Sequence, residues 1–158
     1  MKLRAAPRER PPVTEATQSW VVVAGPATGF AQTVEIGEHH LLGDEPVALG
    51  GTNTGPGPYD YLLAALGTCT SMTLSFYARK RDWPLESVSV RLRHSKIHAA
   101  DCEACETETG MIDRIEREIT LVGERLSEDQ RVKLLAIADR CPVHRTLKAE
   151  IDIVSSLV

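Results

Sequence analysis

The segment from residue 59 to residue 81 constrains the fold more than any other part of the sequence. Its apolar residues recur on every side of a predicted helix, and the polar residues between them are mostly small. Pro58 suits the first turn, where a missing N–H costs nothing, and Asp60 lies where the helix dipole favours a negative charge. A helix without a polar stripe must be buried by its own domain or by a second subunit. The sequence therefore predicts a long central helix.

Alternating apolar and polar residues predict strands on both sides of this helix. The predicted strands are residues 20–24, 30–36, 40–42, 88–93, 115–121 and 151–155. The first two are separated by a turn rich in glycine and proline, which is typical of a hairpin. The loop at 50–58 is also rich in glycine and proline, but it lacks the lysine and the strand context of a phosphate-binding loop, so we expect it only to position the helix.

Two shorter helices are predicted near the C-terminus. Residues 127–130 form a capping box that opens a helix. We expect its inward-facing residues to be Val132, Leu134, Leu135 and Ala138. Pro142 can start a second helix that runs to Lys148. Cys141 would then lie at or near that helix's N-terminus, where backbone N–H groups favour a thiolate.

The composition predicts one folded domain. The chain has 158 residues, of which 42% are hydrophobic, and this is enough for a real core. Residues 1–17 combine basic residues with prolines and cannot bury enough apolar surface to fold, so we expect a flexible arm followed by a single domain over residues 18–158.

Several classes of partner are disfavoured by composition. Aromatic residues make up 4% of the chain and the net charge is −4, so nucleic acid is not an expected partner. The longest apolar run is too short to span a membrane, and no signal-peptide pattern opens the sequence. We therefore expect a cytoplasmic protein.

Cys69 and Cys141 are the candidate functional residues. Two thiols on facing helices or at element ends can exchange electrons with a substrate and with each other. Function thus depends on whether these two residues meet. The chain's four cysteines are too few for a disulfide scaffold and predict free, catalytic or metal-binding thiols.

One arginine occupies an unexpected position. Arg117 shares its strand parity with Ile115, Ile119 and Leu121, which are expected to face inward. A bulge or a sheet edge would explain this pattern, and the other interpretation is that Arg117 supplies a fixed positive charge to the interior.

Two motifs together resemble the OsmC/Ohr family, the osmotically induced and organic hydroperoxide resistance proteins. They are the stretch Gly51-Thr-Asn-Thr-Gly-Pro-Gly-Pro-Tyr-Asp-Tyr-Leu-Leu-Ala-Ala-Leu-Gly-Thr-Cys-Thr70 and, downstream, Cys141-Pro-Val-His-Arg-Thr-Leu147. The resemblance implies an α+β fold in which antiparallel sheets wrap two long central helices of an intertwined homodimer. It also implies that Cys69 and Cys141 are the family's two catalytic cysteines.

The implied chemistry is reduction of organic hydroperoxides without a cofactor or metal. Cys69 would attack the peroxide and become a sulfenic acid, Cys141 would resolve it to a disulfide, and an external dithiol would reopen the disulfide. The family's carboxylate corresponds approximately to Asp60, one residue later than usual. The arginine of the organic hydroperoxide branch is missing from the N-terminal hairpin here, so its role is open among Arg117, Arg145 and the N-terminal arm.

A second group of residues carries alternative functions. His94, His98, Cys102 and Cys105 include the ligand types of a zinc site, although their spacing is not that of a zinc finger. The alternatives for Cys102 and Cys105 are a labile disulfide and a plain solvent loop. The competing functions for the chain are therefore a metal-binding protein and a non-catalytic dimeric module that binds a small apolar ligand.

Overall fold

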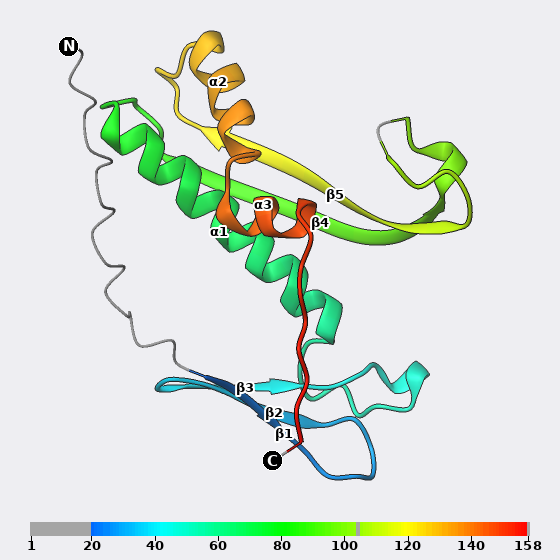
Figure 1. Cartoon of the computed structure of the whole chain (residues 1–158). Coiled ribbons are helices and arrows are strands. Elements are labelled where there is room, and N and C mark those ends of the chain that lie inside the picture. Colours follow the sequence, from blue (N-terminus) through cyan, green and yellow to red (C-terminus); the bar gives the residue numbers. More distant parts are fainter. Residues whose placement is uncertain (1–19, 104, 158) are drawn as a thin grey trace, which may run out of the picture. The chain divides into compact units, whose positions relative to one another are not determined.

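The computed structural model describes residues 20–103 and 105–157. The chain has a mixed α+β fold with antiparallel sheets, and it divides into two compact units, residues 1–56 and 57–158 (Figure 1). The flexible arm predicted over residues 1–17 lies outside the described residues. In the part of the chain that is described, no helix is long and apolar enough to cross a membrane.

The first unit contains a three-stranded antiparallel sheet. Its strands are β1 (Val21–Ala24), β2 (Gln32–Ile36) and β3 (His39–Gly43), in the order β1-β2-β3. Alternate residues of β2 are half-buried, as expected for a sheet with one covered face. The predicted hairpin and its short third strand are confirmed.

A buried carboxylate, Asp44, organises the loop after β3, which includes the 3₁₀ turn η1 (Val47–Leu49). Asp44 accepts hydrogen bonds of 2.6–3.0 Å from the backbone N–H groups of Glu45, Thr52 and Thr54 and from the hydroxyls of both threonines. These bonds, led by the Thr52 hydroxyl, hold the pKa of Asp44 far below its usual range. The loop also requires Gly51, because a Cβ there would lie 1.9 Å from the Glu45 carbonyl oxygen.

The second unit is built on α1 (Pro58–Lys80), which confirms the predicted long helix. The carboxylate of Asp60 accepts the N–H of Gly57 at 2.9 Å and so caps the first turn. One face of α1 is buried, and its buried residues are Leu66, Gly67, Thr70, Leu74 and Ala78. Met72 and Phe76, in contrast, are 66% and 61% exposed. The chain itself therefore covers α1 on one side.

A long hairpin packs against α1. It consists of β4 (Ser87–His98) and β5 (Met111–Val122), which pair without interruption from Ser87↔Val122 to His98↔Met111. Both strands extend beyond the predicted segments. The strand predicted for residues 151–155 is wrong: the described residues after 149 contain no strand, and Ile151 and Ile153 are exposed. An alternating sequence forms a strand only where another strand offers a ladder partner.

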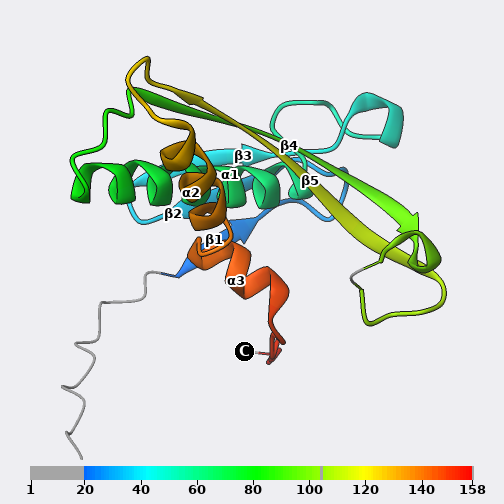
Figure 2. The same cartoon turned by 90° about the horizontal axis from the view of Figure 1, so that it is seen from above.

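Two helices lie against α1, as Figures 1 and 2 show from two directions. They are α2 (Glu128–Ala138) and α3 (Pro142–Lys148), and both confirm the predictions. The capping box of α2 is present: Ser127 Oγ accepts the N–H of Gln130 at 3.2 Å, and Gln130 Oε1 accepts the N–H of Ser127 at 3.0 Å.

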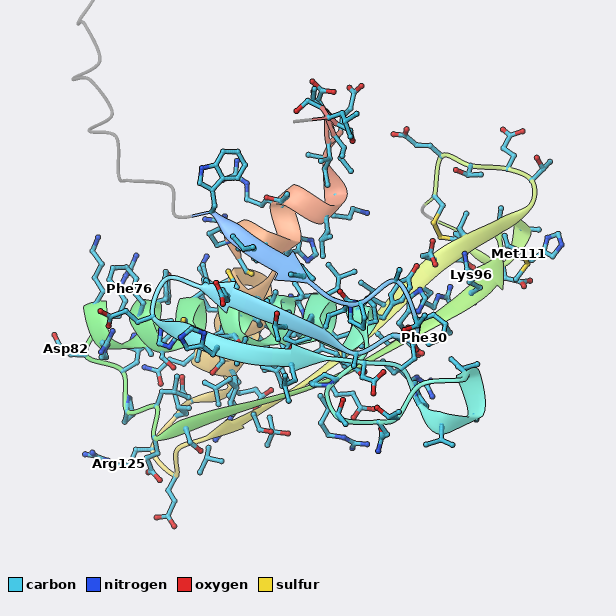
Figure 3. The ribbon with its side chains drawn as sticks, turned by 90° about the horizontal axis from the view of Figure 1, so that it is seen from below. Phe30, Phe76, Asp82, Lys96, Met111 and Arg125 are labelled. Carbon is cyan, nitrogen blue, oxygen red and sulfur yellow. A yellow bond between two sulfur atoms is a disulfide. The ribbon has the colours of Figure 1, made fainter. Side chains whose placement is uncertain are left out.

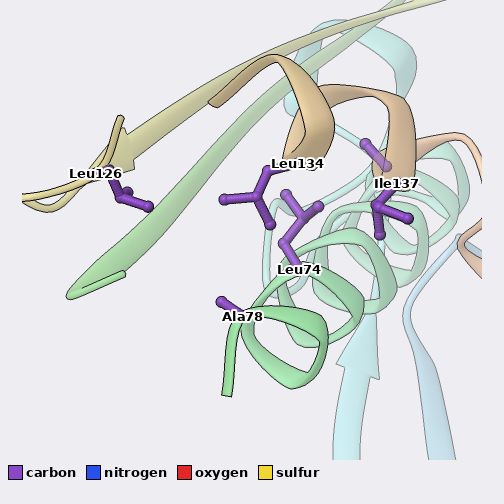
Figure 4. Close-up of a cluster of buried hydrophobic side chains, with 6 residues drawn as sticks. Leu74, Ala78, Leu126, Leu134 and Ile137 are labelled. Carbon is purple, nitrogen blue, oxygen red and sulfur yellow. The ribbon is translucent and has the colours of Figure 1, made fainter. Parts of the chain in front are cut away.

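The core of the second unit lies between α1 and α2 (Figure 4). Its buried residues are Leu74, Ala78, Leu126, Leu134, Ile137 and Ala138. The expected inward face of α2 is correct for Leu134 and Ala138 and wrong for Val132 and Leu135, which are 61% and 59% exposed. The buried residues of α2 are Leu134, Ile137 and Ala138, which follow the i, i+3, i+4 spacing of one helix face. Val132 and Leu135 lie outside this face.

Candidate thiol site

The two free cysteines meet where α3 begins beside the middle of α1. Cys69 and Cys141 carry free thiols that lie close enough for each to affect the pKa of the other. Cys141 is fully buried, whereas Cys69 is partly exposed. The two thiols are thus neighbours, and Cys69 is the more accessible residue of the pair.

The surroundings of the two sulfurs shift their pKa values in opposite directions. Burial raises the pKa of Cys69, and the hydrogen bond to Cys141 raises it further. Burial also opposes charge on Cys141. There, however, it is outweighed by the hydrogen bond from Cys69, the backbone N–H of His144 and the Thr70 hydroxyl, so the pKa of Cys141 lies below its usual value. Each thiol thus affects the pKa of the other, which is raised at Cys69 and lowered at Cys141.

Arg117 brings a positive charge to this site from β5. Its Nη1 donates to Thr70 Oγ1 at 3.1 Å and to the Ala138 carbonyl at 3.3 Å, and its Nη2 donates to Asp139 Oδ1 at 2.8 Å. The β4–β5 register is continuous through Arg117, which lies opposite Leu92. A bulge therefore does not explain its inward parity. β5 is an edge strand of a two-stranded sheet, so the sheet-edge explanation stands beside the interpretation as an interior positive charge.

Thr70 is a site residue that the sequence analysis missed. It is fully buried and accepts from Arg117, and its one hydroxyl proton can be donated either to the Leu66 carbonyl at 2.8 Å or to the Cys141 sulfur, where it lowers the pKa of that thiol. Its position directly after Cys69 and the inward parity of Arg117 were the available signals. From the sequence alone, Thr70 is one of several small polar residues between the apolar positions of the helix.

The two other predicted site residues lie at the margins. Asp60 precedes Cys69 by nine residues, which is about 14 Å along a helix axis. It lines an open depression of about 650 Å³ between α1 and β4. Arg145 is exposed on α3 and lines a different open depression together with Asp139 and His144.

A small pocket lies beside Arg117. It has a volume of about 310 Å³ and lies between α1, β5 and α3. Its lining residues are Leu66, Asp113, Ile115, Arg117, His144, Leu147 and Lys148. Three of these are aliphatic and three are basic or potentially so, which suits a small molecule with an apolar body and a polar oxygen.

The second predicted group of residues does not assemble into a metal centre. Cys102 and Cys105 form a disulfide, so their sulfurs are not thiolate ligands in this state. His94 instead bonds to Asp113 through Nε2 at 2.7 Å and stacks on Tyr59 with ring centroids 4.2 Å apart. Among the described residues, no three His, Cys, Asp or Glu side chains are grouped closely enough to share a metal ion. Of the alternatives for Cys102 and Cys105, the structure shows the disulfide.

Comparison with known proteins places this site in a family. A family model described as OsmC-like protein matches residues 51–156, a range that includes both free cysteines, Thr70 and Arg117. The chain belongs to the OsmC-like family. No functionally curated protein sequence shows significant similarity to the chain.

Solved structures of OsmC-like proteins share the fold. An OsmC-like protein from Mycoplasma pneumoniae has a TM-score of 0.65 at 18% identity, covering 84% of this chain and 89% of that one. An organic hydroperoxide resistance protein OsmC from Legionella pneumophila has a TM-score of 0.60 at 20% identity, with coverages of 87% and 93%. An OsmC-like protein of unknown function from Vibrio cholerae has a TM-score of 0.63 at 13% identity, with coverages of 85% and 96%.

Proposed function

We propose that this OsmC-like protein is a thiol-dependent peroxidase that reduces organic hydroperoxides. The observation that carries the proposal is the hydrogen-bonded pair of free thiols, one accessible and the other buried. The name of the Legionella pneumophila relative, an organic hydroperoxide resistance protein, supports this class of substrate.

In the first step, the Cys141 thiolate takes the proton of the Cys69 thiol across their hydrogen bond. The resulting Cys69 thiolate attacks the terminal oxygen of the hydroperoxide, and the O–O bond breaks. Cys69 becomes a sulfenic acid, and the departing alkoxide takes the proton back from Cys141 and leaves as an alcohol. In this scheme Cys141, which has the lower pKa, acts as the base, and Cys69, which is more accessible, acts as the nucleophile.

In the second step, the Cys141 thiolate attacks the sulfenic sulfur. Hydroxide leaves and a Cys69–Cys141 disulfide forms. An external dithiol then reduces the disulfide by two exchange steps and is itself oxidised to a disulfide. The contact between the two thiols means that resolution needs little movement, since a disulfide requires Cα atoms within about 7 Å.

Arg117 is the arginine that we assign to the site, as a positioning residue that acts through Thr70. A fixed cation near the sulfurs favours the thiolate and the polarised peroxide. Asp60 and Arg145 are kept as proposed site residues with lesser roles, at the first turn of α1 and on the exposed side of α3. The pocket of about 310 Å³ beside Arg117 is the proposed site for the organic part of the substrate.

We further propose that the working unit is a homodimer. Met72 and Phe76 leave the apolar face of α1 exposed in the isolated chain, and a second copy would bury it. The dimer would then contain the two long central helices that the family resemblance implies. A cytoplasmic location agrees with the use of free, reducible thiols.

Steady-state peroxide consumption with cumene hydroperoxide and a dithiol tests this function. Cys69→Ser removes consumption, because no other thiol is placed to attack. Without the dithiol, Cys141→Ser allows at most one turnover, slowed by the loss of the Cys141 base, and leaves Cys69 over-oxidised, because no thiol within the chain traps the sulfenic acid. The Cys102→Ser/Cys105→Ser variant is the matched control and keeps full activity. Wild-type protein that binds an apolar ligand without consuming peroxide would favour the binding-module alternative instead.

A further inference from the structure

The Cys102–Cys105 disulfide lies at the connecting end of the β4–β5 hairpin. Figure 3 shows its yellow bond beside the end of the hairpin that carries Met111. Its Cα atoms are 5.6 Å apart, and the two residues are three positions apart in the sequence. Cys105 is exposed and Cys102 is half-buried. One sulfur is therefore open to an external thiol while the other is sheltered, an asymmetry that suits exchange through a mixed disulfide.

The loop holds its shape by hydrogen bonds that do not involve the disulfide. The buried Ala99 donates its N–H to the Gly110 carbonyl at 2.8 Å, and Cys102 donates its N–H to the Ala99 carbonyl at 3.0 Å. Arg114 Nη2 donates to the Asp101 carbonyl at 3.3 Å. The β-ladder is already complete at His98↔Met111. The bond can consequently open and close without unfolding the hairpin.

This disulfide is separate from the thiol site. Arg117, whose side chain reaches the thiol site, is six residues from Met111 along β5, and this spacing corresponds to about 20 Å. Direct exchange with Cys69 or Cys141 of the same chain would require bond formation across that distance. Cys102 and Cys105 therefore need a reductant from outside the chain.

The surface around the disulfide is acidic. Its exposed carboxylates are Asp101, Glu103, Glu106 and Glu108, and they outnumber the basic Arg114, which donates to the Asp101 carbonyl. Such a cluster attracts cations and repels anions over about 10 Å at 0.1 M salt. An incoming thiol is thus selected by its charge.

We propose that Cys102 and Cys105 form a second dithiol/disulfide redox couple, which exchanges with neutral or cationic external thiols and disfavours anionic ones. A thiolate of the external dithiol attacks Cys105 Sγ, the Cys102–Cys105 bond breaks, and Cys102 leaves as a thiolate that takes up a proton. The second thiol of the reductant, or a second molecule where the reductant is a monothiol, then attacks the mixed disulfide and releases Cys105. Two electrons and two protons pass to the protein, and the reductant becomes a disulfide.

The test uses the Cys69→Ser/Cys141→Ser variant, in which only Cys102 and Cys105 can react. Alkylation and mass spectrometry follow their reduction by dithiothreitol, cysteamine and glutathione, with rates expressed per thiolate. We expect dithiothreitol to reduce the bond while the circular dichroism spectrum stays native. Cysteamine should react at least about threefold faster than glutathione at low salt, and the ratio should fall toward one near 1 M salt.

The matched control neutralises the loop while keeping both cysteines, as Asp101→Asn/Glu103→Gln/Glu106→Gln/Glu108→Gln. Its cysteamine-to-glutathione ratio should be close to one at low salt. Reduction that occurs only after unfolding would overturn the redox couple, and a ratio unaffected by salt or by neutralisation would overturn the charge selection. Stoichiometric zinc that is retained by the reduced loop and prevents reoxidation would replace the proposal with a metal site.

Discussion

At the scale of single residues, Arg117 is linked to the thiol pair through Thr70. The guanidinium donates to Thr70, and the Thr70 hydroxyl is one of the groups that lower the pKa of Cys141. Because Arg117 also bonds to Ala138 and Asp139, one side chain ties β5 to both α1 and the end of α2. Its planar fork serves three acceptors, which a lysine cannot do with the same geometry.

Arg117→Lys should lower peroxide reduction by about tenfold or more, because the ammonium cannot hold Thr70 and the helix end together. The pH profile of thiol alkylation should shift upward with it, since the Cys141 thiolate loses support. Arg145→Lys, measured in parallel, shows whether Arg145 contributes more or less to peroxide reduction than Arg117.

The matched control is Arg93→Lys, which alters an exposed arginine paired with Glu116 on the same hairpin. This variant should keep both activity and the pH profile of wild type. An Arg117→Lys protein with a normal profile, or a greater loss in Arg145→Lys, would move the positioning role away from Arg117.

Asp44 gives a prediction of pH-dependent stability. Its pKa in the folded chain is below the usual value, so the ionised carboxylate stabilises the fold above the unfolded pKa of about 4. This stabilisation should be lost as the pH falls from about 4 toward the folded pKa. Asp44→Asn should therefore lower the thermal midpoint at pH 7, and its deficit should shrink as acid is added. A deficit that stays constant between pH 7 and strongly acidic pH would disprove the linkage.

At the scale of elements, local signals predicted most of the second unit. Proline at the first turn, the carboxylate of Asp60 and the Ser127 capping box all mark helix starts by chemistry that acts within a few residues. The strands were predicted too short, because Lys96 and Asp113 occupy positions that have the parity of the apolar residues and so break the alternation.

Tertiary partners decided the features that local signals could not. The face of α2 depends on where α1 crosses it, and Leu134 and Leu135 are equally apolar neighbours of which one is buried. Residues 151–155 alternate like a strand but have no ladder partner within the described chain. The contact between Cys69 and Cys141 could be expected from the family resemblance, whereas the role of Thr70 required the position of Arg117.

At the scale of the whole molecule, the exposed apolar side of α1 predicts a homodimer. Met72 and Phe76 lie one helical turn apart on the exposed side, where a second copy would cover them. Wild-type protein should scatter light as a dimer at micromolar concentration. Phe76→Glu should shift the mass toward the monomer, because a buried unpaired charge opposes association. Arg79→Glu, an exposed charge change near the end of the same helix, is the control. A stable wild-type monomer would contradict the dimer.

The central claim is that Cys69 and Cys141 act together on peroxide, and peptide mapping after a single turnover tests it most directly. Reduced wild-type protein is treated with one equivalent of cumene hydroperoxide, quenched with an alkylating reagent and digested. We predict that the peptides carrying Cys69 and Cys141 are recovered joined by a disulfide, with one equivalent of alcohol released. Recovery of both cysteines as alkylated thiols, with the hydroperoxide intact, would contradict the account.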